Sequence, residues 1–441
     1  MTQPLISTKT NVSLKGQIVV AGDKSISHRS LIFSSLANGV SNISGLLEGE
    51  DVLKTAEALR KMGARIRQVE AGKWQVNGIG YCGLQESDDI LDMGNSGTST
   101  RLLMGLVAPF DFKSTFTGDA SLRKRPMKRV FDPIGEIGAE VICRGNNLLP
   151  ATIVGTDQPL PITYEMKMAS AQVKSAIMLA ALNINGKTTI IEPEKCRDHT
   201  EIMMKYLGID VKVEPLNNGN KITVSGCNDF DAKDFVVPAD ISSAAFMIVA
   251  ALIVPGSKIR MHNIGVNPLR DGIVTTLKEM GGNIQLENER LVGGEKVADI
   301  VVKYSQLVGI NVPASRAPSM IDEYPILSIA ASYASGNTKM NGLAELKAKE
   351  SNRLDAVASG LSLCGVETIV GDDSLEVIGG FKSQDNVAQI KTHLDHRIAM
   401  SFLVMGLGLK SGVKIDDSEP INTSFPNFVK IFSDFGVEFK K

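Results

Sequence analysis

One local pattern recurs six times along the 441 residues, and it constrains the fold more than any other feature. In each copy a helix-like segment meets a glycine and continues as a strand-like segment, as in LRKMGARIRQV. Glycine just past a helix is the expected C-cap, because it adopts a positive φ without a Cβ clash. The glycines follow one another at intervals of 75, 70, 73, 84 and 71 residues: Gly63, Gly138, Gly208, Gly281, Gly365 and Gly436. This regular spacing predicts a repeat architecture.

A second helical segment precedes each glycine junction. These segments are rich in Ala, Ser, Met and Leu and carry few charges, as in AQVKSAIMLAALNING at 171–186, which is typical of a helix buried on most sides. By contrast, DVLKTAEALRKMG at 51–63 is amphipathic and is expected to lie outside. Alternating segments with turn residues between them follow the glycines and predict hairpins. The sequence therefore predicts an α/β fold of six units, each running strand, buried helix, strand, outer helix, strand, strand.

The length of the chain favours two domains, because a single hydrophobic core does not usually extend over this many residues. Six units divide naturally as three and three. We expect residues 1–20 together with 237–441 to form one discontinuous domain and residues 21–236 to form the other. The sixth unit stops soon after its first strand beyond Gly436, and the N-terminal strand LKGQIVV is expected to complete it. Both chain ends would then lie in one domain.

Composition and charge exclude several classes of protein. With a net charge of −2 the chain lacks the basic excess of a nucleic-acid-binding domain. Its five cysteines are scattered, without metal-ligand spacing, which predicts neither a disulfide framework nor a metal site and favours the cytoplasm. No apolar run approaches the roughly 18 residues that span a bilayer, and the N-terminus lacks the features of a targeting segment. We therefore expect no metal, no nucleic acid and no membrane partner.

Cationic side chains gather at the starts of the predicted helices, for example in GDKSISHR and LDHR. Buried helices packed side by side point their N-termini at a common face, where unpaired N–H groups and the helix dipole favour anions. An arginine also recurs 11 to 13 residues before four of the repeat glycines. The planar fork of arginine suits phosphate and carboxylate groups. A polyanionic ligand is therefore predicted for these eight cations: Lys24, Arg29, Arg125, Arg197, Arg270, Lys349, Arg353 and Arg397.

Eight short motifs occur in a characteristic order between about Gly22 and Pro426: GDKSISHR, GNSGTSTR, RPM, SAQVKSA, RDHTE, DEYP, KESNR and DHRIAM. Together they resemble the motifs of the 5-enolpyruvylshikimate-3-phosphate synthase family, and RDHTE and DEYP are similar to its class II members. The resemblance implies the enolpyruvyl transferase fold, in which each of two domains has three βαβαββ units and forms an inside-out α/β barrel of buried parallel helices. The active site is then expected in the cleft between the domains.

The resemblance also implies the reaction. The enolpyruvyl group of phosphoenolpyruvate is transferred to the 5-hydroxyl of shikimate 3-phosphate by addition and elimination, with release of phosphate, as a step of chorismate and aromatic amino acid biosynthesis. Neither a metal nor an organic cofactor takes part. The expected partners are these two small-molecule substrates, and the expected oligomeric state is a monomer.

The resemblance assigns residues to each substrate. Shikimate 3-phosphate is expected to contact Lys24, Ser25, Arg29, Ser170, Ala171, Gln172, Arg197, Asp322 and Lys349. Phosphoenolpyruvate is expected to contact Lys24, Gly97, Arg125, Gln172, Arg353 and Arg397. Three of the residues are assigned catalytic roles: Asp322 as the base for the attacking hydroxyl, Glu350 as the acid that protonates the methylene carbon, and Lys24 at both substrates.

Two positions of this chain, Thr423 and Gly97, bear on differences between the classes of the family. Class I members carry a further lysine near the C-terminus, where NTSFP places Thr423 in this chain, so that this cationic contact is expected to be absent or replaced. Gly97 corresponds to the small residue that affects binding of glyphosate, a mimic of phosphoenolpyruvate. Gly97 leaves room for the inhibitor, but class II members often resist it, so the sequence leaves sensitivity open.

Two other functions compete with this interpretation. Enolpyruvyl transfer to another acceptor, such as a UDP-sugar, is disfavoured because that family carries Lys-Asn where this chain has Lys24 and Ser25, and usually a cysteine in the loop at 122–127. A non-catalytic anion-binding protein of the same fold would have no need of Asp322 and Glu350.

Overall fold

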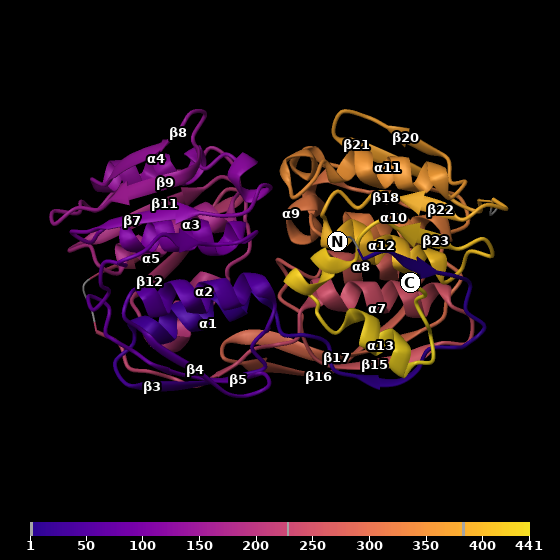
Figure 1. Cartoon of the computed structure of the whole chain (residues 1–441), viewed down its shortest axis with the longest axis horizontal. Coiled ribbons are helices and arrows are strands. Elements are labelled where there is room, and N and C mark those ends of the chain that lie inside the picture. Colours follow the sequence, from indigo (N-terminus) through magenta and orange to yellow (C-terminus); the bar gives the residue numbers. More distant parts are fainter. Residues whose placement is uncertain (1–2, 227–228, 382–383) are drawn as a thin grey trace. The chain divides into compact units, whose positions relative to one another are not determined.

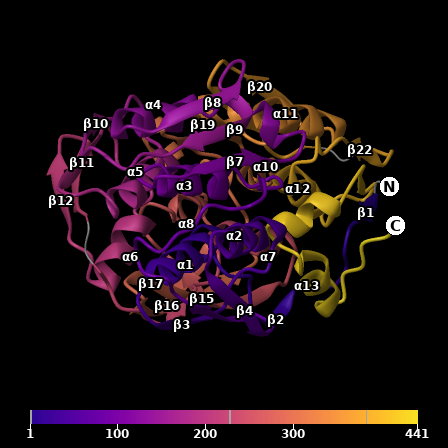
Figure 2. The same cartoon turned by 60° about the vertical axis from the view of Figure 1, so that its left-hand side comes forward.

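The computed structural model describes residues 3–226, 229–381 and 384–441, and the chain divides into two compact units. Unit 1 consists of Met1–Ala21, Ala239–Arg290 and Lys296–Lys441, whereas unit 2 consists of Gly22–Pro238 and Leu291–Glu295 (Figure 1). The two chain ends lie side by side in unit 1 (Figure 2). There the Ile6 N–H donates to the Lys440 carbonyl at 2.7 Å, and the Lys440 N–H donates back to Ile6 at 2.9 Å.

Unit 2 contains three four-stranded sheets of the same design. Their strand orders are β14-β3-β5-β4, β6-β7-β9-β8 and β10-β11-β13-β12, and in each the first two strands are parallel and the rest antiparallel. The strands are β3 (Val40–Ser44), β4 (Arg65–Glu70), β5 (Lys73–Asn77), β6 (Leu91–Asp92), β7 (Lys113–Thr117), β8 (Glu140–Arg144), β9 (Leu148–Val154), β10 (Thr163–Glu165), β11 (Lys187–Glu192), β12 (Val211–Leu216), β13 (Gly219–Ser225) and β14 (Phe235–Val236). The helices are α1 (Lys24–Leu36), α2 (Glu50–Lys61), α3 (Gly97–Val107), α4 (Lys128–Ile137), α5 (Ala171–Ala181) and α6 (His199–Leu207).

Unit 1 repeats this design in two four-stranded sheets, β16-β17-β15-β2 and β18-β19-β21-β20, and in the three-stranded sheet β1-β23-β22. The strands are β1 (Leu5–Ser7), β2 (Lys15–Ile18), β15 (Lys258–Gly265), β16 (Asn283–Val292), β17 (Glu295–Lys303), β18 (Asn311–Val312), β19 (Asn337–Asn341), β20 (Thr368–Val370), β21 (Ser374–Ile378), β22 (Ala388–Ile390) and β23 (Val413–Ile415). The helices are α7 (Ile241–Ile253), α8 (Gly272–Glu279), α9 (Ala317–Met320), α10 (Tyr324–Ser332), α11 (Arg353–Leu363), α12 (His396–Gly406) and α13 (Phe428–Asp434).

The predicted glycine junctions are confirmed at all six positions. Each glycine directly follows the last turn of an outer helix and has a φ between 81° and 115°. Such φ values are accessible to glycine at little cost and are strained for most other residues. The six junctions are Gly63, Gly138, Gly208, Gly281, Gly365 and Gly436.

The predicted buried helices are also confirmed. Every residue of α7 is buried, and in α12 only one residue of eleven, Arg397, is not. In unit 2 the helices α3 and α5 approach so closely that a Cβ on Gly105 would lie 2.3 Å from the Ala176 carbonyl oxygen. None of the helices in the described ranges is both long and apolar enough to cross a membrane.

The prediction for the N-terminal strand was wrong. Its residues form β2, which pairs in parallel with β15 in the sheet of the fourth repeat, with Lys15 opposite Lys258. The sixth repeat is completed by β1 instead, which pairs antiparallel with β23, with Leu5 opposite Ile415. Strand partners are selected by contacts between residues far apart in the chain, so the local pattern of LKGQIVV identified a strand without identifying its neighbour.

Candidate active site

The first group of predicted site residues begins at the N-terminus of α1 in unit 2. The Asp23 side chain caps this helix by accepting from the Ile26 N–H at 2.9 Å. Lys24, the first helical residue, forms an ion pair with the mostly buried Asp51 of α2. The Lys24 side chain is 20% exposed, so Asp51 holds it at the helix start without burying it completely.

Arg29 lies one turn further along α1 and is buried. Its Nε donates to Thr200 Oγ1 at 2.7 Å and its Nη2 donates to Ser175 Oγ at 2.6 Å. Its Nη1 donates to the carbonyl of Ser25 at 2.9 Å, one turn back on the same helix. Burial lowers the pKa of Arg29 to about 10, which leaves the guanidinium protonated at neutral pH. Arg29 therefore presents a fixed positive charge that joins α1 to α5 and α6.

The start of α3 places Gly97 against two arginines. A Cβ on Gly97 would lie 2.7 Å from Arg101 Nη1 and 3.2 Å from Arg125 Nη1. Arg125 is anchored by Asn95, whose Oδ1 accepts from Arg125 Nη2 at 2.6 Å. The absence of a side chain at position 97 thus lets two guanidinium groups approach the N-terminus of a helix, where anions are favoured.

Gln172 connects the starts of α5 and α3. Its Oε1 accepts from Arg101 Nη1 at 2.9 Å, and its Nε2 donates to Thr98 Oγ1 at 3.0 Å. Ser170 caps α5 and Ala171 is the first residue of the helix, so both stand beside Gln172 at the same helix end. Gln172 therefore links the start of α5 to the start of α3, next to Gly97.

A buried charged cluster lies beneath this part of unit 2. Lys174 Nζ contacts Glu192 Oε2 at 2.9 Å and Glu201 Oε1 at 2.6 Å, and the three side chains are 1%, 0% and 4% exposed. Burial disfavours the lysine charge, but the carboxylate of Glu201 and then that of Glu192 raise the pKa of Lys174 above its ordinary value. Burial also raises the pKa of Glu201, whose Oε2 has no hydrogen-bond partner among the described residues.

The cluster also supports Arg197. Lys174 Nζ donates to the carbonyl of Cys196 at 3.2 Å, directly before Arg197 in the loop between β11 and α6. Cys196 Sγ in turn lies 3.3 Å from Glu192 Oε2. Arg197 is half-buried, so the loop that carries it is fixed from below by a buried cation. The sequence analysis did not select Lys174; a single lysine within the apolar run AQVKSAIMLAAL was the available signal.

In unit 1 the predicted residues gather around Arg353 at the start of α11. Its Nε donates to Asp395 Oδ2 at 2.8 Å and its Nη1 donates to Asp322 Oδ1 at 3.1 Å, while its Nη2 forms an ion pair with Glu350. Arg353 is 1% exposed, and burial alone would disfavour its charge. The carboxylates of Asp395, Glu350 and Asp322 outweigh burial and raise the pKa of Arg353. One guanidinium group thus brings together Asp322 and Glu350, the predicted base and acid.

Two further cations complete the group in unit 1. Lys349 Nζ lies 3.6 Å from Asp322 Oδ1. Arg397, at the start of α12, donates from Nη1 to the Asp322 carbonyl at 3.1 Å and lies 3.6 Å from Glu323 Oε1. Thr423 Oγ1 lies 3.5 Å from His396 Nδ1 beside the same helix start.

The predicted residues therefore fall into two groups, one in each unit. Lys24, Ser25, Arg29, Gly97, Arg125, Ser170, Ala171, Gln172 and Arg197 belong to unit 2, and Asp322, Lys349, Glu350, Arg353 and Arg397 belong to unit 1. Asp395 is the main addition to the second group, because it caps α12 and accepts from Arg353 at the same time. Among the described residues, no group of three or more His, Cys, Asp or Glu side chains could hold a metal ion.

Comparison of the sequence with known proteins gives a consistent result. The family model described as EPSP synthase (3-phosphoshikimate 1-carboxyvinyltransferase) matches residues 8–432. The 3-phosphoshikimate 1-carboxyvinyltransferase of Paramagnetospirillum magneticum is 53% identical over 439 residues, which cover 99% of this chain and 98% of the relative. That of Zymomonas mobilis is 51% identical over 441 residues, covering 99% and 97%.

Solved structures agree with the sequence comparison. EPSP synthase from Acinetobacter baumannii superimposes with a TM-score of 0.88 at 42% identity, covering 100% of this chain and 99% of that one. The enolpyruvyl transferase NikO from Streptomyces tendae superimposes with a TM-score of 0.79 at 16% identity, covering 100% and 99%. The second likeness, at this low identity, bears on the fold alone and supports the predicted enolpyruvyl transferase architecture.

Proposed function

This chain belongs to the EPSP synthase (3-phosphoshikimate 1-carboxyvinyltransferase) family, and we propose that each of its units supplies part of one active site. The protein is a transferase of the shikimate pathway that moves the enolpyruvyl group of phosphoenolpyruvate to shikimate 3-phosphate. Enolpyruvyl transfer to a UDP-sugar is not favoured. Glyphosate is a known inhibitor of this enzyme family.

The observation that carries the proposed roles of Asp322 and Glu350 is the contact of Arg353 with both carboxylates. A guanidinium group that holds two carboxylates in one site can place one of them beside the acceptor hydroxyl and the other beside the methylene carbon. In the proposed reaction the hydroxyl oxygen of shikimate 3-phosphate attacks C2 of phosphoenolpyruvate, and Asp322 accepts the proton of that hydroxyl. Glu350 gives a proton to the methylene carbon, so that C2 becomes tetrahedral.

Elimination then reverses the proton transfer at carbon. A proton leaves the methyl group, the C2–O bond to phosphate breaks, and the double bond reforms in the product. Inorganic phosphate is released and no net oxidation or reduction occurs. Glu350 thus gives a proton in the addition and takes one back in the elimination, Asp322 holds the proton of the hydroxyl, and the cations around them stabilise the phosphate as it leaves.

The assignment of each substrate draws on both units. Shikimate 3-phosphate would contact Lys24, Ser25, Arg29, Ser170, Ala171, Gln172 and Arg197 of unit 2 and Asp322 and Lys349 of unit 1. Phosphoenolpyruvate would contact Lys24, Gly97, Arg125 and Gln172 of unit 2 and Arg353 and Arg397 of unit 1. We therefore propose that the substrates bind in a cleft between the units. The cations offset the repulsion between two anionic substrates, and exclusion of water strengthens each contact.

We further propose that the enzyme acts as a monomer in the cytoplasm. The described cysteines, Cys82, Cys143, Cys196 and Cys364, are free thiols, which is usual in a reducing compartment. Light scattering of the purified protein over a range of concentrations tests the oligomeric state, and cell fractionation tests the location.

Kinetics of three isosteric or near-isosteric variants test the residue roles. We expect Asp322→Asn, Glu350→Gln and Lys24→Met each to lower turnover by orders of magnitude while leaving the fold, followed by circular dichroism, intact. Glu367→Gln, at an exposed position of unit 1, is the matched control for Glu350→Gln and should leave turnover unchanged. Near-normal turnover of Glu350→Gln would remove that carboxylate from the mechanism.

A further inference from the structure

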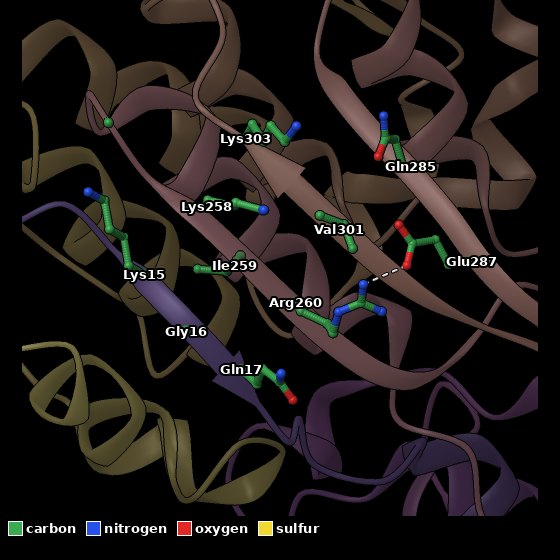
Figure 3. A pocket seen from close by; sticks show the side chains of 11 residues that line it. Lys15, Gly16, Gln17, Lys258, Ile259, Arg260, Gln285, Glu287, Val301 and Lys303 are labelled. Carbon is green, nitrogen blue, oxygen red and sulfur yellow. Dashed lines mark hydrogen bonds and ion pairs between the residues drawn. The ribbon is translucent and has the colours of Figure 1, made fainter.

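A second cationic feature lies in unit 1, apart from the residues described above. The sheet β16-β17-β15-β2 carries a hollow of about 650 Å³ (Figure 3). Its lining includes Lys15, Lys258, Arg260 and Lys303, and Glu287 is the one acidic residue among the described residues that line it. The lining therefore carries an excess of three positive charges, although the whole chain has a net charge of −2.

Three of these cations stand in one row across three strands. Lys258 of β15 is directly opposite Lys303 of β17 on one side and directly opposite Lys15 of β2 on the other. Directly paired residues project from the same face of a sheet, and neighbouring strands are about 4.8 Å apart, so the outer two lysines start about 10 Å from each other. Figure 3 shows the three side chains at one edge of the hollow. We call Lys15, Lys258 and Lys303 the lysine row.

No carboxylate of the described residues forms an ion pair with the lysine row. The acidic residue of the hollow, Glu287, is engaged by Arg260, whose Nη2 lies 2.6 Å from Glu287 Oε2. Like charges directly opposite each other destabilise a sheet. The row therefore carries a repulsion that the neighbouring side chains do not offset.

Protection of a sheet edge does not explain the row. A lysine on an edge strand can prevent pairing with another chain, and β2 is an edge strand, which accounts for Lys15. Lys258 and Lys303 lie on β15 and β17, which have neighbours on both sides. Protection of the sheet edge therefore accounts for only one of the three charges.

From this geometry we infer that the hollow binds a run of linked phosphate groups, with the lysine row along its length. A linear polyanion can contact all three ammonium groups without drawing them together, and it removes their mutual repulsion. A single phosphate group engages fewer of them. Affinity should therefore rise from phosphate to pyrophosphate to tripolyphosphate, and it should fall with salt because the contacts are exposed. A nucleoside triphosphate carries the same chemistry.

Calorimetric titration of the full chain tests the inference. Tripolyphosphate is titrated in the presence of saturating shikimate 3-phosphate and phosphate, so that the active-site cations are occupied. We expect binding to persist under these conditions, and we expect Lys258→Gln to weaken it by about five- to tenfold. Lys339→Gln is the matched control, because Lys339 of β19 directly faces Glu376 and lies outside the hollow. It should leave the affinity unchanged.

Further measurements show whether the variants are folded and which phosphate compounds bind. Lys258→Gln should keep full enolpyruvyl transfer activity and unfold at the parent temperature or above it, because a like-charge repulsion has been removed. Lys303→Gln should weaken binding as Lys258→Gln does. Adenosine triphosphate that binds in the same manner would support recognition of the phosphate run whichever molecule supplies it. Tripolyphosphate binding that substrates abolish, or that both lysine variants retain at the parent affinity, would overturn the inference.

Discussion

Replacement of Lys174 by methionine tests the physical basis of the unit 2 site. The substitution keeps an unbranched side chain of similar length but removes the only cation that contacts the buried carboxylates of Glu192 and Glu201 among the described residues. Removing one partner of a buried ion pair costs about 3–5 kcal/mol, since the other charge stays buried without compensation. For a unit of this size that corresponds to a fall of roughly 10 °C in unfolding temperature.

The unfolding of unit 2 can be followed by itself. Trp74, the single tryptophan of the chain, lies in β5 of the same unit and is 5% exposed. Urea unfolding monitored by Trp74 fluorescence should give the full loss of 3–5 kcal/mol for Lys174→Met. Lys205→Met, at an exposed position of α6, is the control and should change the free energy of unfolding by less than about 0.5 kcal/mol.

The pH dependence of Lys174→Met gives the reasoning a second test. Burial raises the pKa of Glu201 in the folded state, and removing the lysine takes away the charge that opposes this rise. The folded variant then binds more protons than the unfolded chain, so its stability is greatest at low pH and falls as pH rises through the folded pKa. The deficit relative to the parent should therefore grow as pH rises above the ordinary pKa of a glutamate. A loss below about 1 kcal/mol, or one that does not change with pH, would refute the reasoning.

Three further predictions concern single positions. Gly97→Ala places a methyl group 2.7 Å from Arg101 Nη1 and 3.2 Å from Arg125 Nη1, and steady-state kinetics should show KM for phosphoenolpyruvate raised about tenfold with a smaller change in kcat. Arg353→Lys keeps the charge but loses the fork that reaches three carboxylates; turnover should fall at least about 100-fold, and parent-like turnover would contradict its role. Burial raises the pKa of Asp299, but hydrogen bonds outweigh burial and lower it to about 2, so the stabilisation from this carboxylate is lost as pH falls through that value. Asp299→Asn should therefore flatten the acid-unfolding curve between about pH 4 and pH 2. An unchanged curve, followed by circular dichroism, would count against this.

The repeat could be predicted because it depends on a local rule. A glycine such as Gly208 ends a helix by adopting positive φ, and this requirement is written in the residues next to it. The partner of the N-terminal strand could not be predicted in the same way. Lys15 pairs with Lys258, 243 residues away, and nothing in the pattern of LKGQIVV distinguishes β15 from β23 as a neighbour.

The residues of the candidate site were predicted more fully than the contacts that hold them in place. Helix starts and recurring arginines identified Arg353, but its contacts with Asp322 and Asp395 join residues 31 and 42 positions away, so the sequence alone did not show them as one cluster. Lys174 was missed for a related reason. Its partners Glu192 and Glu201 follow on other elements, and a lysine in an apolar helix gains its meaning only when those carboxylates are placed beside it.

The most direct test of the central claim measures phosphate released by the purified chain from phosphoenolpyruvate, with shikimate 3-phosphate and UDP-N-acetylglucosamine supplied in turn as acceptors. We predict rapid release with shikimate 3-phosphate and none above background with the nucleotide sugar. Release with UDP-N-acetylglucosamine alone, or with neither acceptor under conditions where the folded chain binds shikimate 3-phosphate, would contradict the account.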